Sequence, residues 1–127
     1  IAGLLEGLRF IQRKSPEVIL NHERFLAARC ADALSALPGV RVFAAPRLFC
    51  QAGVLSFQVD GMDCEDVGQA LGEQGIAVRS GLHCAPLAHR SAGTLDVGTI
   101  RVSFSAFNSS GDVDALAGAV ARLPRRQ

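Results

Sequence analysis

A cysteine beside a histidine is the strongest candidate for chemistry in this sequence. The stretch "AVRSGLHCAPLAH", residues 77–89, holds Cys84 next to His83, with Arg79 five residues before the cysteine. A thiol becomes a useful nucleophile when nearby positive charge or a base favours the thiolate. The same pattern also fits a half-buried loop cysteine beside a surface histidine, because reactivity depends on exposure. Both interpretations stay open from the residues alone.

Metal binding is a third interpretation of the same loop. His89 joins His83 and Cys84 in an H-C-x4-H cluster, but zinc sites need a fourth ligand that the loop does not offer. The chain has four cysteines, Cys30, Cys50, Cys64 and Cys84. Their spacing matches neither a C-x-x-C pair nor a zinc knuckle. The sequence therefore predicts no metal site and favours reduced thiols over disulfides.

Length and charge exclude several classes of protein. A chain of 127 residues has the size of one domain and can bury roughly two thirds of its unfolded surface. Lys and Arg together number 13 against 12 Asp and Glu, so there is no bulk positive field for nucleic acid or an anionic membrane. No stretch has the pattern of a spanning helix or a signal peptide. We expect a soluble, cytoplasmic protein.

Helices are predicted at several places from periodicity and capping residues. Apolar residues recur at helical spacing through residues 1–13. Ser15 and Pro16 then supply an N-cap and a first helical position for a second helix, which ends at Pro38. Two later helices have their own signals, which are Asp63 as N-cap with Gly75 at the end, and a capping box of Ser109 and Asp112.

Four strands are predicted from β-branched and aromatic content, over residues 40–44, 53–61, 76–80 and 99–107. The first two should pair as antiparallel neighbours. The loop between the last two is about 18 residues long, and loops of that length tend to be functional or mobile. The order of elements predicts an α+β fold, a small and mostly antiparallel sheet of three to four strands with helices packed on one face.

Two motifs resemble one family of enzymes. Residues 75–86, "GIAVRSGLHCAP", resemble the catalytic-cysteine loop of group II cysteine desulfurases and selenocysteine lyases, within the class V aminotransferase family of pyridoxal phosphate (PLP) enzymes. The family pattern Arg-x-Gly-x-His-Cys-Ala is matched by Arg79, Gly81, His83, Cys84 and Ala85. Residues 98–116 resemble the family's closing strand and helix, with Arg101 and then Phe107-Asn108 at the recurring places. The resemblance covers nearly the whole chain.

The resemblance implies roles for individual residues. Cys84 would take the sulfur of L-cysteine as a persulfide, leave L-alanine, and pass the sulfur to an acceptor protein, as in iron–sulfur cluster assembly. Arg101 would clamp the substrate carboxylate, for which a planar guanidinium gives two parallel bonds. Arg79 would line the same pocket. For His83, orienting the loop, relaying a proton and a merely structural role all stay open.

The resemblance also implies parts that this chain lacks. Lys14 is its only lysine, and its surroundings do not resemble the family's Ser-x-x-His-Lys site for the Schiff base. No residue here is therefore predicted to bind the PLP cofactor. Residues 1–127 are expected to be the carboxy-terminal small domain, in which residues 1–14 end a helix that links to an absent large PLP-binding domain. We expect the full-length enzyme to be a homodimer and the isolated chain to be inactive.

Two departures and two alternatives accompany this interpretation. Leu82 stands where many group II enzymes have a second histidine, and the segment 87–99 is longer than in better-known members, so we expect a hairpin or lid there. One alternative is a selenocysteine lyase or class V aminotransferase. The other is a stand-alone α+β binding or sulfur-accepting module without PLP chemistry. Such a module should have a polar sheet face, whereas a domain of a larger enzyme should expose an apolar patch. The apolar start "IAGLLEGL" favours the domain.

Overall fold

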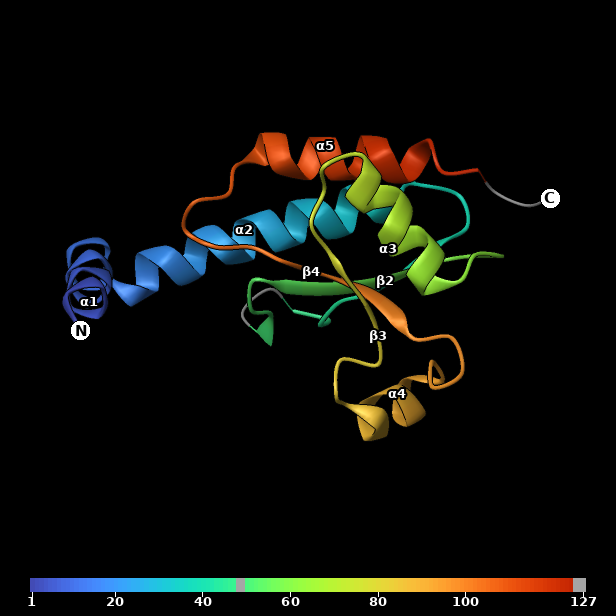
Figure 1. Ribbon diagram of the computed structural model, residues 1–127, viewed down its shortest axis with the longest axis horizontal. Coiled ribbons are helices and arrows are strands. Elements are labelled where there is room, and N and C mark those ends of the chain that lie inside the picture. The colour runs from blue at the N-terminus through green and yellow to red at the C-terminus, as the bar shows by residue number, and fades with distance from the viewer. Residues whose placement is uncertain (48–49, 125–127) are drawn as a thin grey trace.

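The computed structural model describes residues 1–47 and 50–124. Within these residues the chain forms five helices and four strands (Figure 1). In chain order they are α1 (Ala2–Lys14), α2 (Pro16–Ser35), β1 (Val40–Phe43), β2 (Val54–Val59), α3 (Cys64–Glu73), β3 (Arg79–Gly81), α4 (Pro86–Ala92), β4 (Thr99–Ser103) and α5 (Ser110–Ala121). The predicted α+β class is confirmed.

The four strands form one antiparallel sheet in the order β1-β2-β4-β3. Burial alternates along β2, where Leu55, Phe57 and Val59 are buried while Ser56 and Gln58 are half-buried. Because successive side chains of a strand point to opposite faces, one face of the sheet meets the core and the other carries polar groups. We call the second one the open face. The predicted antiparallel pairing of β1 with β2 is confirmed.

Three helices cover the core face of the sheet. α2 and α3 contact the strands, and α5 packs on α2 and α3 (Figure 1). Leu26, Cys30 and Leu34 of α2 are fully buried there with residues of α3 and α5. The predicted packing of helices on one face holds for these three helices. α4 differs, because it lies on the other side of the sheet (Figure 1).

The predicted helix starts are confirmed by their hydrogen bonds. The Ser15 hydroxyl accepts from the Val18 amide at the start of α2, with Pro16 in the first turn. The Asp63 carboxylate accepts from the Glu65 amide at 2.8 Å and caps α3. Each cap satisfies an amide that has no partner within its own helix. The capping box of α5 is present as well, with the Ser109 amide donating to Asp112 at 2.8 Å.

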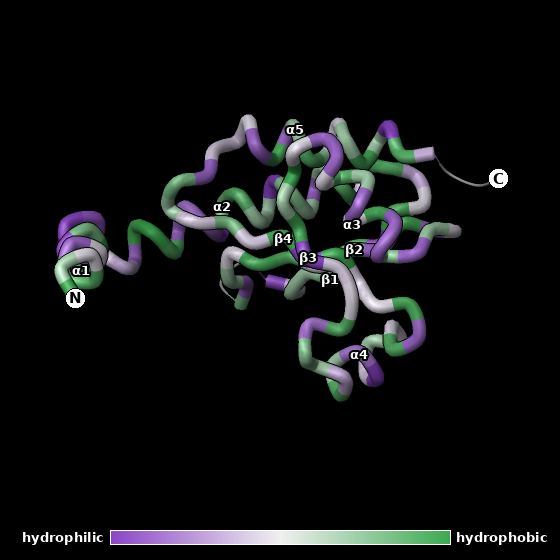
Figure 2. Tube along the Cα trace, viewed as in Figure 1, coloured by the Kyte–Doolittle hydropathy of each residue, from purple (hydrophilic) through white to green (hydrophobic). Residues whose placement is uncertain are grey.

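α1 projects from one end of the molecule (Figures 1 and 2). None of its residues is buried. In the described part of the chain, α2 is the only helix or strand that α1 contacts. A second attachment is aromatic, since the ring of Phe10 stacks on that of Phe107 with centroids 5.2 Å apart. The large apolar side chains of α1 are exposed, namely Leu4, Leu5, Leu8 and Ile11.

Two strands are shorter in the structure than the sequence analysis predicts. The strand expected over 76–80 is wrong for its first half, because the Ile76 amide donates to the Leu71 carbonyl at 3.0 Å and closes the end of α3. The strand expected over 99–107 ends at Ser103. The Ser105 amide donates to Asn108 Oδ1 at 2.9 Å, which turns the chain toward α5.

The hairpin or lid expected over 87–99 is a short helix followed by a turn. Pro86 begins α4, and Gly93, with φ 68°, ends it. Both residues occupy favoured places, because proline suits the first helical turn and glycine adopts the left-handed conformation that ends a helix. The connection of about 18 residues that was expected to be a loop therefore contains a helix of 7 residues.

Candidate active site

Cys84 lies at the tip of a tight turn. The Ala85 amide donates to the Leu82 carbonyl at 2.9 Å, which places His83 and Cys84 at the two central positions. Both have positive φ, 51° and 59°. These are the φ signs of a type I′ turn, in which the second central position favours glycine. Each non-glycine residue in this region costs about 1–2 kcal/mol, so the fold holds an exposed thiol in a strained backbone.

His83 is attached to the start of β4. Its Nε2 lies 3.1 Å from the Thr99 carbonyl oxygen and 3.2 Å from Thr99 Oγ1. A carbonyl oxygen only accepts, so Nε2 carries the proton and Nδ1 is the acceptor. Nδ1 is buried and has no hydrogen-bond partner among the described residues. Sequence reasoning did not find Thr99, because this contact joins residues that are sixteen positions apart.

Burial lowers the pKa of His83 below its ordinary value. The charges of Arg101, His89 and Arg79 lower this pKa further, whereas the hydrogen bond to Thr99 opposes the shift. A lowered pKa means that the imidazole is neutral at pH 7. This agrees with the tautomer that the Thr99 carbonyl requires.

The predicted arginines lie together on the open face. In the register of β3 and β4, Arg79 is directly opposite Arg101, and Ser56 is opposite Arg101 on the other side. Arg41 is on the open face of β1, with its guanidinium 4.7 Å from the ring of Phe43. The four strands contain no Asp or Glu. The open face is therefore cationic and can attract an anion.

Arg101 has an unsatisfied donor. Its side chain is half-buried, and its Nε is buried without a hydrogen-bond partner in the described part of the chain. An unpaired buried N–H of a charged group is costly, and a carboxylate would satisfy it with a charge-assisted bond. Arg79 is exposed beside it. Carboxylate binding by this pair stays a prediction, in which Arg101 is the more buried of the two side chains.

His89 has a structural attachment. It is buried, and its Nδ1 lies 2.7 Å from Thr94 Oγ1, across the turn that ends α4. Its ring centroid is 5.9 Å from that of His83. Among residues 1–47 and 50–124, no three His, Cys, Asp or Glu side chains are grouped closely enough to hold a metal ion. Both histidines have threonine partners.

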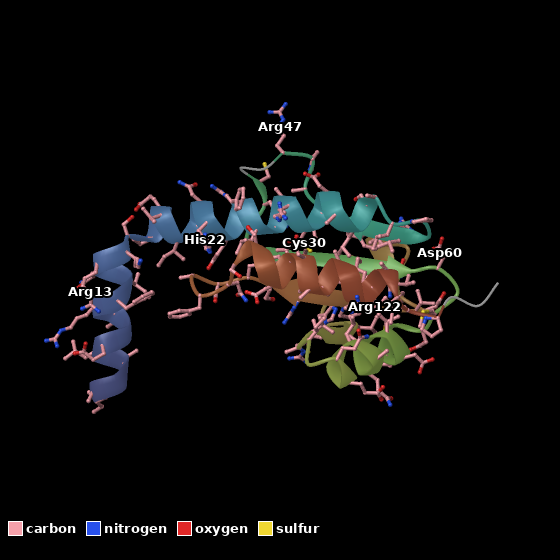
Figure 3. All side chains as sticks on the ribbon, turned by 90° about the horizontal axis from the view of Figure 1, so that it is seen from above. Arg13, His22, Cys30, Arg47, Asp60 and Arg122 are labelled. Atoms are coloured by element: carbon pink, nitrogen blue, oxygen red, sulfur yellow. The ribbon has the colours of Figure 1, made fainter. Side chains whose placement is uncertain are left out.

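The other cysteines differ from Cys84 in exposure. Cys30 and Cys64 are buried, and Cys50 is exposed on a loop. Burial raises the pKa of Cys30 to about 12 and also raises that of Cys64. Figure 3 shows Cys30 on the side of α2 that faces the interior. Only a minute fraction of these two thiols is ionised at pH 7, so they pack as small apolar side chains.

No residue of this chain fits the Schiff base of a PLP cofactor. The single lysine, Lys14, is the last residue of α1 and is exposed. α1 contacts α2 and does not contact the sheet in the described part of the chain. A PLP lysine must lie beside the substrate, and Lys14 does not meet that condition.

No helix among the described residues is long and apolar enough to cross a membrane.

The fold and this turn place the chain in a known class. The sequence profile of the Aminotransferase class-V family matches residues 1–116, and the chain belongs to this family. Among curated relatives, it is 34% identical to a probable cysteine desulfurase of Mycobacterium leprae over 96% of this chain. A cysteine desulfurase of Synechococcus elongatus is 38% identical over 95%. The chain spans 29% and 19% of the length of these two relatives.

Solved structures show the same relationship. The apo cysteine desulfurase of Thermococcus onnurineus superposes with a TM-score of 0.85 at 35% identity, covering 94% of this chain and 29% of that one. The cystine C-S lyase C-DES, in complex with its product cysteine persulfide, gives a TM-score of 0.75 at 25% identity, with 95% of this chain and 28% of that one covered. A mutant of C-DES has glycine covalently linked to its PLP cofactor, with a TM-score of 0.69 at 26% identity and coverage of 97% and 29%.

Proposed function

We propose that this chain is the carboxy-terminal small domain of a PLP-dependent cysteine desulfurase that acts in the cytoplasm. The enzyme would convert L-cysteine to L-alanine and leave a persulfide on Cys84, which an acceptor protein then receives, for instance in iron–sulfur cluster assembly. The observation that carries this proposal is the exposed thiol at the tip of the 82–85 turn. That turn lies in the segment that aligns with cysteine desulfurases.

L-cysteine and the Cys84 thiol together supply every atom of the two products. The carbon–sulfur bond of L-cysteine breaks and a sulfur–sulfur bond forms at Cys84 Sγ. The carbon that loses sulfur gains a hydrogen, so L-cysteine and the thiol give L-alanine and the persulfide without an external oxidant or reductant. A thiol of the acceptor protein then takes the outer sulfur, and the Cys84 thiol is restored. An exposed turn suits both steps, because its tip can meet two different partners.

Arg101 and Arg79 would orient the substrate. The unpaired Nε–H of Arg101 would donate to the carboxylate of L-cysteine, and Arg79, opposite on β3, would add positive charge. The absence of acidic residues from all four strands leaves the two guanidinium groups without competing carboxylates on the sheet. Binding through the carboxylate would present the sulfur of the substrate to other groups of the site.

The cofactor would be held outside this chain. Since Lys14 does not fit the Schiff base, we assign the PLP-binding residues to a large domain that accompanies these 127 residues in a longer enzyme, which we propose to be a homodimer. The share of the relatives that the chain covers, 29% for one of them, is consistent with a separate domain. The exposed apolar side chains of α1 offer a surface for it.

The test is a single turnover with L-cysteine. The natural protein that contains this chain, loaded with PLP, should release L-alanine and gain the mass of one sulfur atom on Cys84. Cys84→Ser should abolish the persulfide, and Cys50→Ser, which removes the other exposed thiol, should not. The isolated 127 residues should neither release L-alanine nor gain sulfur on Cys84. Alanine release by the isolated chain, or sulfur on Cys50 instead of Cys84, would refute the proposal.

A second candidate is a stand-alone binding or sulfur-accepting module. The cationic and polar open face, with Arg41, Gln58 and Arg101, favours this module. The exposed apolar side of α1 and the family relationship favour the domain. A native mass equal to that of this chain, with no PLP, would support the module. Parallel assays with L-selenocysteine and with an amino-group acceptor would separate the desulfurase from a selenocysteine lyase or an aminotransferase.

A further inference from the structure

The conformation of the Cys84 turn needs a support that its own sequence does not provide. Type I′ turns favour Asn or Gly at their centre, and here the two central residues are His83 and Cys84, with φ 51° and 59°. One hydrogen bond closes the turn, from the Ala85 amide to the Leu82 carbonyl. Strained backbone of this kind persists where the surroundings hold it in place.

The His83 side chain provides that support. Its Nε2–H donates to the Thr99 carbonyl at 3.1 Å, and Thr99 is buried at the first position of β4. Thr99 is two residues before Arg101, so both side chains lie on the open face, about 7 Å apart along the strand. The imidazole thus joins the turn that carries the thiol to the strand that carries the carboxylate-binding guanidinium.

A proton-relay role fits these observations less well. The second nitrogen, Nδ1, is buried and has no partner in the described residues, whereas a relay needs a group on each side. The charged or titratable groups around the ring are Arg101, His89 and Arg79, which all oppose a positive imidazole. The strands next to the ring have no carboxylate that could stabilise one.

We propose that His83 is a positioning residue, whose Nε2–H bond to the Thr99 carbonyl fixes the Cys84 turn on β4 and so sets the reach of the thiol relative to Arg101. This inference rests on the proposed function and assigns His83 a role within it. The bond acts on the approach of the sulfur to Cys84. It does not act on the binding of the substrate carboxylate.

Two substitutions of His83 separate the bond from the ring. His83→Asn suits the positive φ, but its amide reaches only as far as Nδ1 and loses the bond to Thr99. His83→Gln places an amide N–H near the position of Nε2 and can keep the bond. His22→Asn is the matched control. His22 is on α2, away from the turn, and its Nε2 also bonds a backbone carbonyl, that of Asn108, at 2.8 Å.

Two measurements on the natural protein that contains this chain test the proposal. In His83→Asn, hydrogen exchange at the Ala85 amide should rise about tenfold, as expected for the loss of one supporting hydrogen bond. Persulfide formation on Cys84 in a single turnover should fall on the order of 100-fold, the effect of a small misplacement of a reacting atom. The KM for L-cysteine should stay unchanged. His83→Gln should recover most of the rate, and His22→Asn should change neither measurement.

The outcomes separate the positioning role of His83 from the proposed desulfurase function. If His83→Asn leaves both Ala85 exchange and the persulfide rate at wild-type values, the positioning role is wrong. If the rate falls while Ala85 exchange is unchanged and His83→Gln does not recover it, His83 acts through its protons and the proposal is again wrong. If the wild-type protein forms no persulfide from L-cysteine, the proposed function fails, and the exchange measurement alone still decides whether His83 holds the turn.

Discussion

Arg79 and Arg101 lie directly opposite each other on neighbouring strands, and no strand of the sheet has an acidic residue. Like charges in such a pair destabilise an antiparallel sheet. The arrangement is therefore unfavourable without an anion, and it becomes favourable when an anion lies between or beside the two guanidinium groups. This repulsion is the cost to stability that we expect of the anion site proposed for these two arginines.

Removing the exposed member of the pair should stabilise the domain. We expect Arg79→Ser to raise the free energy of unfolding by about 0.2–1 kcal/mol, because it removes the cross-strand repulsion. The gain should shrink at high salt, which screens exposed charges. Urea denaturation at two salt concentrations measures both. Arg41→Ser is the control and should not stabilise, since Arg41 lies over the ring of Phe43. A destabilised Arg79→Ser variant would contradict the expected repulsion.

Arg101→Lys should weaken substrate binding in the natural enzyme. Lysine keeps the charge and loses the planar pair of donors. Hydrogen bonds to charged groups contribute about 1.5–3 kcal/mol, so kcat/KM for L-cysteine should fall by about 10- to 150-fold, mainly through KM. Steady-state kinetics of alanine release check this. Arg122→Lys, at the far end of α5, should have no effect. An unchanged KM in Arg101→Lys would show that the carboxylate binds elsewhere.

The four thiols should differ in reactivity toward iodoacetamide. Cys84 and Cys50 are exposed and should be labelled in the folded protein. Burial raises the pKa of Cys30 from 9.0 to about 12, which leaves about a thousandfold less thiolate than in an exposed thiol. Cys64 should also be protected. Mass spectrometry of peptides locates the label, and all four cysteines should react in urea. Labelling of Cys30 at the rate of Cys84 would contradict the packing of α2.

Acidification should destabilise the domain through His83. Its pKa is lowered from 6.5 on folding, mainly by burial, so the unfolded chain binds this proton more readily than the folded one. The stability is therefore complete above pH 6.5 and falls as the pH drops from 6.5 toward the lowered pKa of the folded state. Urea denaturation at about pH 7 and about pH 5 measures the loss. It should be smaller in His83→Asn than in the wild type, and equal losses would exclude this origin.

α1 should open more readily than the rest of the isolated domain. It has no buried residue, and helices of 13 residues are marginal on their own in water. Amides of Ala2–Lys14 should therefore exchange rapidly, while those around Leu26 and Cys30 of α2 exchange slowly. Hydrogen exchange with mass spectrometry compares the two helices. Equal protection would mean that α1 is covered in solution. Phe107→Ala should further increase the exchange rate of the α1 amides, because it removes the stacking partner of Phe10.

Local signals in the sequence were sufficient for much of the fold. Ser15, Asp63 and Ser109 cap the helices that they were predicted to cap, because capping depends on groups within three residues. The same kind of signal is present for α4 in Pro86 and Gly93, but the segment is also rich in residues that suit loops, which favoured a loop over a helix. The strand over 76–80 was wrong in its first half for the opposite reason. Its hydrophobic residues suit a strand, but a hydrogen bond to α3 captures Ile76.

The candidate site residues come from a sequence motif, but the motif does not predict how they are arranged. Cys84, Arg79 and Arg101 were identified from their motif. The register that places the two arginines opposite each other depends on the pairing of β3 with β4, which a single sequence does not specify. The bond between His83 and Thr99 depends on the same pairing. Contacts across a sheet follow from the pairing of strands, and only the folded chain reveals them.

The left-handed backbone at Cys84 has a consequence for any variant library of this domain. Glycine is the residue that relaxes φ 59°, so Cys84→Gly should relieve strain while it removes the thiol. A screen that scored only solubility or melting temperature would enrich this substitution and lose the thiol. Under the proposed function, selection for folding and selection for sulfur transfer act in opposite directions at this one position.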